Sequence, residues 1–357
     1  MAMNINDEVR PGGNRYVSGT DVIKDLPEYL AAFKDIAIVT GNVSYRVFND
    51  YYQEELPFPV YRYDGSASYE NAQEIANQIG KADVIVGIGG GRVCDTAKLT
   101  AEVLNCDVIL VPTLISNCAP FTPITAVYYP NRTFRCMGFQ TRAPYLTLVD
   151  WQFLLATPRE YFEAGIGDTL AKWYEIEGIT RRLNEEDKSA YTRLGIACAK
   201  EIAAILFEDS QKAINSLNQQ TITPAFARVA DTIVALAGET GGFAVSYGRS
   251  AGAHAVHDGL SYLEETHKAL HGKKVAYGIL VQLAYTNDFD EISKILPFYE
   301  QIGLPNKLAQ MNIENATKES LAPVIQQAAA KDDTFPMIDP EVTEEQVFAA
   351  IQAVEAL

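Results

Sequence analysis

Residues 83–98, DVIVGIGGGRVCDTAK, contain the stretch that decides the fold class. Asp83–Ile88 is a short, continuous apolar run, which is typical of a strand buried on both faces of a parallel sheet. Three glycines, Gly89–Gly91, follow it, and Val93–Leu104 has the apolar spacing of a helix. A strand that passes through glycines into a helix is the repeating unit of α/β domains, so we expect a parallel sheet.

Further elements are predicted on both sides of this unit. Strands are expected at Ile36–Thr40, Pro59–Asp64, Asp107–Pro112 and Tyr145–Val149, and a helix at Ala67–Ile79. Beyond Trp151 the apolar spacing is helical, over Pro158–Thr180, Asp187–Phe207, Ser210–Leu217, Thr223–Gly241, Lys274–Asn287, Asp290–Ile302, Lys318–Lys331 and Thr343–Leu357. Strands followed by helices in a chain of 357 residues indicate two domains. We predict an α/β domain with a Rossmann-like parallel sheet over 1–155 and an all-α helical bundle over 156–357.

Composition excludes several classes of function. A formal charge of −17 argues against nucleic-acid binding, which needs basic patches. No apolar run is as long as a membrane span, and the first residues lack the basic and apolar regions of a secretion signal. The five cysteines are odd in number and have no CxxC spacing, which indicates reduced thiols in the cytoplasm. We therefore expect a cytoplasmic protein that binds neither nucleic acid nor a membrane.

The glycine loop of residues 89–91 has two interpretations. Glycines at this place let the backbone approach a pyrophosphate, and the helix that follows offers free N–H groups at its N-terminus. The spacing is neither GxGxxG nor that of a P-loop, so the glycines could equally form a tight turn. Asp95 and Lys98 lie one turn further on. They could form a surface ion pair at i, i+3 or line the nicotinamide end of a cofactor site.

All four histidines of the chain lie in residues 253–272, AHAVHDGLSYLEETHKALHG. Histidine is the commonest metal ligand and titrates near neutral pH, so this crowding indicates metal or proton chemistry. His254 and His257 share one helix face at i, i+3, and His267 and His271 share another at i, i+4. The alternative is a polar helix pair in which the histidines only cap and form hydrogen bonds.

A metal site in this stretch requires the chain to reverse. In one continuous helix, His254 and His271 would lie roughly 25 Å apart, whereas two ligands of one zinc lie within roughly 4 Å. We expect the break at Asp258-Gly259. A third ligand should be an acid elsewhere, and Asp168 is the candidate because it follows glycines and opens an otherwise apolar helix. The alternative role for Asp168 is a helix N-cap.

Taken together, these motifs resemble the glycerol-dehydrogenase-like branch of the iron-containing alcohol dehydrogenase family. The resemblance runs nearly end to end. It rests on GIGGGRVCDTAK (87–98), VPTLISNCAPFTP (111–123), AGIGDTLAKWYE (164–175), and AHAVHDG followed by HGKKVAYG. It implies a dehydroquinate-synthase-like two-domain fold with a divalent metal in the cleft between an N-terminal nucleotide-binding domain and a C-terminal helical domain. A homo-oligomer is also expected.

The resemblance also implies roles for individual residues. Asp168, His254 and His271 would be the metal ligands, and His257 would lie near the nicotinamide as a proton-relay group. The remaining residues divide between cofactor and substrate. Gly89, Gly90 and Gly91 would hold the pyrophosphate, Asp95, Lys98, Thr113 and Ser116 would line the nicotinamide and its ribose, and Cys118 and Phe121 would face the substrate.

Three departures from the family pattern are informative. Iron-dependent members carry a further histidine where this chain has Lys172, which leaves three protein ligands and favours Zn²⁺ over Fe²⁺. Glycerol dehydrogenases carry an aspartate at Cys118, and a neutral residue there tolerates a carboxylate substrate. Within the branch the chain is most similar to members that act on hydroxycarboxylates, which implies the reduction of a 2-oxo acid. NAD-preferring relatives have an aspartate at Gly41, so its absence favours NADP(H) over NAD(H).

The expected reaction is reversible hydride transfer between the nicotinamide and a small secondary alcohol, with the metal as Lewis acid. The proton would leave through water, the ribose hydroxyl or His257. A polyol such as glycerol is the alternative substrate. A lyase resembling dehydroquinate synthase, or a glycerol-1-phosphate dehydrogenase, would need a basic cluster for a phosphate, which this chain lacks. A catalytically silent cofactor-binding protein is the last alternative, and the intact ligand positions argue against it.

Overall fold

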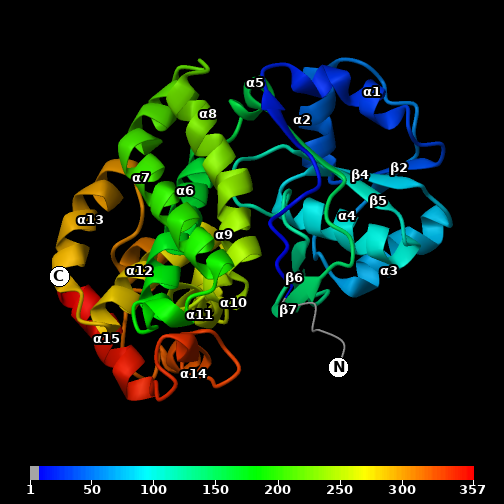
Figure 1. Ribbon diagram of the computed structural model, residues 1–357. Helices are drawn as coiled ribbons and strands as arrows, with labels where there is room; N and C mark the ends of the chain where they lie inside the picture. Colours follow the sequence, from blue (N-terminus) through cyan, green and yellow to red (C-terminus); the bar gives the residue numbers. More distant parts are fainter. Residues whose placement is uncertain (1–7) are drawn as a thin grey trace. The chain divides into compact units, whose positions relative to one another are not determined.

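The computed structural model describes residues 8–357, which form two compact units (Figure 1). The first unit runs to Arg159 and includes Asn215–Glu239, and the second comprises Glu160–Ile214 and Thr240–Leu357. The predicted domain boundaries, 1–155 and 156–357, did not include residues 215–239 in the first unit. The division into two separate domains stays a prediction. Residues 1–7, on which the expected lack of a secretion signal partly rests, lie outside the described residues. Over 8–357 no helix is both long and apolar enough to span a membrane.

A six-stranded parallel sheet forms the centre of the first unit. Its strand order is β1 (Tyr16–Gly19), β8 (Leu146–Asp150), β5 (Asp107–Pro112), β4 (Val84–Gly89), β2 (Ile36–Thr40) and β3 (Val60–Arg62). Strand order switches direction between β2 and β4, because β3 lies beyond β2 whereas β5 and β8 lie beyond β4. In such sheets the crevice at the carboxyl ends of the strands, at the switch point, is where nucleotides bind.

Helices cover both faces of this sheet, as the apolar strands require (Figure 1). On one face, α1 (Leu26–Leu30) and α2 (Asn42–Tyr52) pack over alternate residues of the central strands, with Phe48 fully buried. On the other face, α3 (Tyr69–Ile79) and α4 (Gly91–Leu104) cover the intervening residues. Along β4, for example, Val84 and Val86 face the first layer and Ile85 faces the second.

Three strands of the first unit, and the inclusion of residues 215–239 in it, were not predicted from the sequence. β6 (Ile124–Tyr128) and β7 (Phe134–Phe139) form an antiparallel hairpin. The edge strand β1 is bound to the segment 215–239 through Asp231, which accepts hydrogen bonds from Tyr16 Oη at 2.7 Å and Ser18 Oγ at 3.2 Å. Trp151 Nε1 also donates to Asp231, at 3.4 Å. These contacts between residues far apart in the sequence explain why 215–239 belongs to the first unit.

The remaining helices follow in chain order. They are α5 (Trp151–Leu154), α6 (Arg159–Thr180), α7 (Ala190–Asn218), α8 (Pro224–Asp231), the π-helical η4 (Thr232–Leu236), α9 (Ala237–Ala244), α10 (Ser246–Arg249), α11 (Gly252–Leu260), α12 (His271–Tyr285), α13 (Phe289–Ile302), α14 (Ala322–Ala328) and α15 (Glu344–Ala356). Short 3₁₀ turns are η2 (Val22–Asp25), η3 (Glu185–Asp187), η5 (Glu264–Thr266), η6 (Leu308–Met311) and η7 (Phe335–Met337). The prediction of two separate helices at 187–207 and 210–217 is wrong, because one continuous helix, α7, takes their place. Lys212 spans the expected gap by pairing with Glu208 and Asp209.

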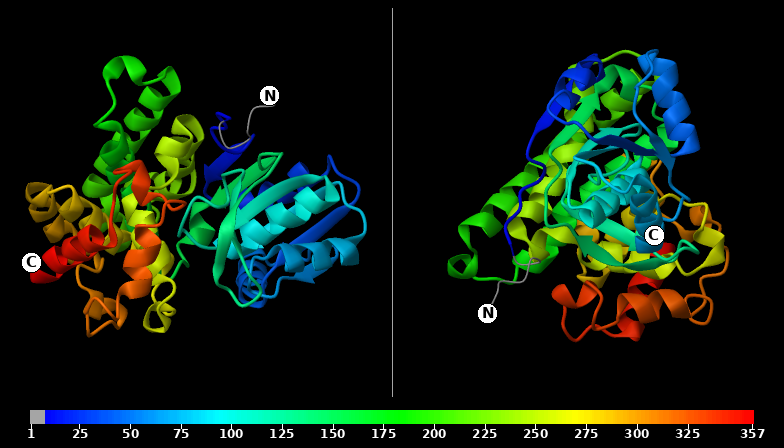
Figure 2. Two further views of the ribbon diagram at one scale, coloured as in Figure 1. Left: turned by 90° about the horizontal axis from the view of Figure 1, so that it is seen from below. Right: turned by 90° about the vertical axis from the view of Figure 1, so that its right-hand side faces the viewer.

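The core of the second unit is built around α11 and α12. These two helices pack against each other, α14 packs on α11, and α15 packs on both α12 and α14. In Figure 2 the orange α14 lies beside the yellow α11 region in both views. His257 on α11 and Lys274 and Gln282 on α12 are buried polar residues, so polar side chains also lie in this core.

Candidate functional site

The glycine loop lies between β4 and α4, at the carboxyl end of the sheet. Gly90 is the N-cap of α4, so the first N–H groups of a fourteen-residue helix are available at this edge. A Cβ at Gly91 would lie 2.6 Å from Asn117 Nδ2, so a side chain at this position would displace the Asn117 side chain of the loop that follows β5. A glycine-lined helix N-terminus at the switch point is suited to a pyrophosphate, as the sequence predicts.

A second loop at the same edge follows β2. Gly41 is the N-cap of α2, and its N–H donates to Ser44 Oγ at 3.1 Å. Arg62, at the end of β3, places its guanidinium 4.3 Å from the centre of the Tyr45 ring and within 3.5 Å of the Gly41 carbonyl. A hydroxyl and a cation therefore lie beside the residue that the sequence associates with cofactor choice.

Asp95 and Lys98 form a buried pair on α4, with Lys98 Nζ 3.0 Å from Asp95 Oδ1. The alternative of a surface ion pair is therefore wrong. Lys98 Nζ also donates to the carbonyls of Ala119 at 2.8 Å and Thr122 at 3.2 Å, and to that of Ile124. Burial raises the pKa of Asp95, although Lys98 opposes this shift. Lys98 thus holds the 119–124 loop through these backbone carbonyls. The predicted contact of Asp95 and Lys98 with the nicotinamide stays a prediction.

The other predicted cofactor and substrate residues follow β5. Thr113 is next to the glycine loop, since its N–H donates to the Gly89 carbonyl at 3.2 Å. Ser116 and Cys118 are partly exposed in the same loop. Phe121 is buried and packs edge-on against an aromatic ring of β1, with 5.4 Å between ring centres. Within this unit, Ser116 and Cys118 are therefore more accessible to a ligand than Phe121.

In the second unit, Asp168, His254 and His271 converge from three helices. Each offers one ligand atom, and the three atoms lie within 4.8 Å of one another. His271 Nε2 is 3.1 Å and His254 Nε2 3.4 Å from Asp168 Oδ1. Two imidazole nitrogens and one carboxylate oxygen are three protein ligands of the kinds that catalytic zinc sites use. The predicted triad thus fits a divalent metal.

The convergence depends on a close approach between α6 and α12. A Cβ at Gly272 would lie 1.9 Å from the Ala164 carbonyl oxygen, so the two backbones meet where this position carries no side chain. Asp168 lies one turn after Ala164, and His271 precedes Gly272, which brings the two ligands side by side. Asp168 lies inside α6, so the expectation that it opens a helix, as well as its N-cap alternative, is wrong.

The chain reversal also differs from the prediction. A break was expected at Asp258-Gly259, but α11 continues to Leu260, and the chain turns back through residues 261–270. A 3₁₀ turn, η5, and the backbone hydrogen bonds of the Leu263–Ala269 loop stabilise this return. His267 lies in the returning loop, exposed and outside the cluster.

The charges of the cluster favour a bound cation. Burial opposes ionisation of Asp168, but His271 and His254 outweigh it and hold the pKa of that carboxyl well below its usual range. Burial likewise disfavours a charge on His254, yet Glu175 and Asp168 raise the pKa of His254 to about 10. An imidazole that holds a proton this strongly lies in a negative potential, which also attracts a divalent metal.

Glu175 is a functional candidate that the sequence did not reveal. It lies on α6 two turns after Asp168 and is buried. His254 Nδ1 lies 2.9–3.0 Å from its carboxylate oxygens, and the N–H groups of Ala251 and His254 also donate to it. Lys172, between the two acids on the same helix face, donates to the Arg249 carbonyl. Carboxylates that hold the outer nitrogen of a histidine ligand are a recurrent feature of metal sites.

His257 lies against His271 rather than alone. Its Nε2 is 2.9 Å from His271 Nδ1, and its Nδ1 is 2.8 Å from Asp258 Oδ1. Burial and the neighbouring His271 lower the pKa of His257 well below its usual range, so the ring is neutral near pH 7. Burial raises the pKa of Asp258 to about 6.

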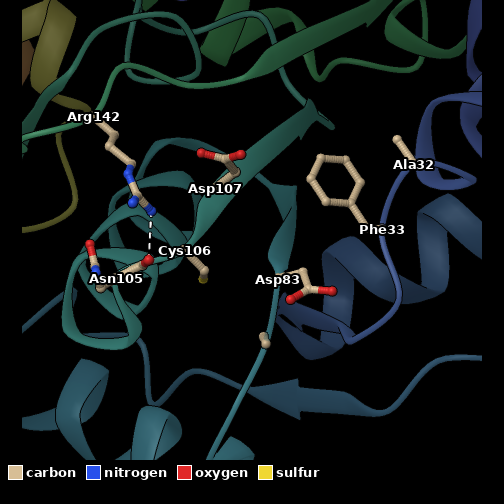
Figure 3. A pocket seen from close by; sticks show the side chains of 8 residues that line it. Ala32, Phe33, Asp83, Asn105, Cys106, Asp107 and Arg142 are labelled. Carbon is tan, nitrogen blue, oxygen red and sulfur yellow. Dashed lines mark hydrogen bonds between the residues drawn. The ribbon is translucent and has the colours of Figure 1, made fainter.

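A surface hollow of about 390 Å³ lies at the opposite edge of the sheet (Figure 3). Asp83 and Asp107 adjoin it at the amino ends of β4 and β5, and Arg142 Nη1 donates to the Asn105 carbonyl across its wall at 2.6 Å. Asp83 caps the N–H groups that follow Phe33. Because parallel sheets bind ligands at their carboxyl ends, this hollow is not a candidate for the cofactor.

Comparison with known proteins agrees with the motifs. The model of the iron-containing alcohol dehydrogenase family matches residues 13–151. A glycerol dehydrogenase of Thermotoga maritima is 32% identical, covering 98% of this chain and 97% of its own. Hydroxycarboxylate dehydrogenase A of Escherichia coli is 34% identical, over 82% and 80%. The crystal structure of a probable glycerol dehydrogenase from Sinorhizobium meliloti 1021 is 27% identical, with a TM-score of 0.87 and 98% coverage of both chains. The chain therefore belongs to the iron-containing alcohol dehydrogenase family and is an oxidoreductase acting on CH–OH groups.

Proposed function

We propose that this protein is a zinc-dependent dehydrogenase that transfers a hydride between NADP(H) and a small 2-hydroxy acid or its 2-oxo acid. The observation that carries the proposal is the convergence of Asp168, His254 and His271, with ligand atoms within 4.8 Å of one another. Zn²⁺ is favoured over Fe²⁺ because Lys172 replaces the further histidine of iron-dependent relatives, and its ammonium group is bonded to a backbone carbonyl.

The residues of the two units have separate tasks in this proposal. Asp168, His254 and His271 would hold the metal, which when bound supplies Lewis-acid stabilisation of negative charge. Glu175 orients His254 by accepting its Nδ1–H. The glycine loop and the N-terminus of α4 would bind the pyrophosphate, and the loop from Thr113 to Ser116 would position the nicotinamide ribose. The chain thus orients the reactants, while the cofactor provides the hydride chemistry.

Two features support a 2-oxo acid as the substrate. Cys118 is neutral where glycerol dehydrogenases carry an aspartate, so no fixed negative charge at this position would repel a carboxylate. Lys172 places a buried cation on the same helix face as Asp168. The similarity to hydroxycarboxylate dehydrogenase A agrees with this choice, whereas the similarity to the Thermotoga maritima glycerol dehydrogenase favours a polyol as the second candidate.

A substrate panel tests the proposal. Purified protein of known metal content is mixed with NADPH or NADH and with 2-oxo acids, ketones, aldehydes or dihydroxyacetone, and the loss of absorbance at the reduced-cofactor band is followed. We expect the highest kcat/KM with NADPH and a 2-oxo acid. A higher value with dihydroxyacetone would favour the polyol reaction, and no turnover despite bound zinc would favour a silent cofactor-binding protein.

The preference for NADP(H) is supported by the loop after β2. Gly41 carries no carboxylate that would repel a 2′-phosphate, and Ser44 offers a hydroxyl at the start of α2. Arg62 adds a cation whose position is fixed by the Tyr45 ring. A guanidinium group is well suited to bind a phosphate.

Arg62→Ala is therefore expected to raise KM for NADPH by roughly 10- to 100-fold, because a hydrogen bond to a charged group is worth about 1.5–3 kcal/mol. KM for NADH should change by less than about threefold under the same steady-state conditions. Arg142→Ala, at the other edge of the sheet, is the matched control. Equal losses with both cofactors would contradict the assignment. Gly41→Asp is a poorer test, because its Cβ would lie 2.9 Å from the Tyr63 ring.

We further propose that the enzyme is a homo-oligomer in the cytoplasm. None of the five cysteines, all of which lie in the described part of the chain, takes part in a disulfide. This supports a reducing compartment. Size-exclusion chromatography with light scattering would measure the assembly directly.

A further inference from the structure

His257 is enclosed in a chain of polar contacts that ends at the proposed metal site. From the outside inward, Asp258 Oδ1 lies 2.8 Å from His257 Nδ1, and His257 Nε2 lies 2.9 Å from His271 Nδ1. His271 Nε2 then lies 3.1 Å from Asp168 Oδ1. His257 is only 7% exposed, so both of its ring nitrogens are committed to protein partners.

The direction of each hydrogen bond in this series follows from the chemistry of the Asp258 carboxylate. An ionised carboxylate only accepts hydrogen bonds, so His257 must carry its proton on Nδ1 and donate it to Asp258. In a neutral imidazole the other nitrogen, Nε2, is then an acceptor. His271 must therefore donate from Nδ1, which leaves the lone pair of its Nε2 directed toward Asp168.

The structure assigns His257 and Asp258 as positioning residues for the ligand His271. Together they fix the tautomer and ring orientation that a metal ligand needs, as Glu175 does directly for His254. Nδ1 of His254 contacts the Glu175 carboxylate directly, and Nδ1 of His271 is connected to the Asp258 carboxylate through His257. Both ligands place Nε2 beside Asp168. The assignment rests on the proposed metal site, and it replaces the expected proton-relay role of His257, since a relay needs a ring nitrogen that can reach the substrate.

The experiment measures metal binding rather than turnover. Metal-free wild type and variants are titrated with Co²⁺, whose visible absorption reports its ligand geometry, and Zn²⁺ affinity is obtained by competition. His257→Ala is expected to weaken both metals by roughly 10- to 100-fold, the usual effect of removing such a partner, and to alter the Co²⁺ spectrum. His257→Gln keeps an acceptor for His271 Nδ1–H and should recover most of the affinity.

Two further variants make the result specific. Asp258→Asn offers an amide, which lets His257 adopt the wrong tautomer, so it should weaken metal binding in the same direction as His257→Ala. His267→Ala, in the exposed loop, should leave affinity and spectrum unchanged. Far-ultraviolet circular dichroism of the metal-free proteins shows whether each variant is folded. If His257→Ala does not fold, the comparison of His257→Gln and Asp258→Asn with wild type tests the assignment.

The outcomes separate this inference from the proposed function. If His257→Ala and Asp258→Asn bind Co²⁺ and Zn²⁺ as wild type does, while kcat falls, the positioning role is wrong and the relay role is favoured. If wild type itself binds neither metal, the proposed function fails first and the positioning role with it. Weaker binding in both variants, with recovery in His257→Gln, supports the assignment.

Discussion

Asp168→Ala is expected to abolish both metal binding and turnover. The carboxylate lies between the two imidazoles, with Oδ1 3.1 Å from His271 Nε2 and 3.4 Å from His254 Nε2. Removing it leaves two neutral ligands and takes away the negative charge that attracts the cation. Since Lewis-acid stabilisation is worth several kcal/mol and each 1.36 kcal/mol is tenfold in rate, kcat/KM should fall by more than roughly 100-fold.

Elemental analysis of the purified variant and steady-state rates with the best substrate measure this effect. His271→Ala should behave in the same way, whereas His267→Ala is the matched control because its side chain is exposed and lies outside the cluster. A variant without Asp168 that keeps a stoichiometric metal and its activity would refute the assignment of the ligands.

Much of the fold could be predicted, because local sequence is informative where a strand is buried on both faces. Ile36–Thr40 and Asp107–Pro112 have the predicted bounds, and structures of related glycerol dehydrogenases confirm the fold class. The edge strand β1, with the sequence YVSG, has no such apolar run. It is held by pairing with β8 and by Asp231, more than two hundred residues away, and no local pattern encodes those contacts.

The candidate site likewise contains residues that the sequence revealed and one that it did not. The motifs identified Asp168, His254 and His271, and the family resemblance from which their roles came is confirmed. Glu175 was missed because one glutamate in a long helix has no signature of its own. A signal was present, however, since Asp168, Lys172 and Glu175 follow at i, i+4 and i+7 on one face of a largely apolar helix. The partner of each polar residue on that face is known only once the helices are packed.

Lys98→Met is expected to destabilise the first unit strongly, whatever the role of Lys98 toward the cofactor. The substitution leaves Asp95 buried without its cation and removes the donor to the carbonyls of Ala119 and Thr122. Removing one member of a buried ion pair costs about 3–5 kcal/mol, because an uncompensated charge stays in the interior. The midpoint of urea unfolding of the cofactor-free protein, followed by tryptophan fluorescence, measures the loss.

The double variant Asp95→Asn/Lys98→Met distinguishes the source of this loss. It removes both charges, so it should be more stable than Lys98→Met alone if the uncompensated Asp95 carboxylate dominates. A residue that only contacted the nicotinamide would behave differently: KM for the cofactor would rise while the unfolding midpoint stayed at the wild-type value. Because Lys98 is almost fully buried and its ammonium faces backbone carbonyls, we expect the unfolding midpoint to fall even in the absence of cofactor.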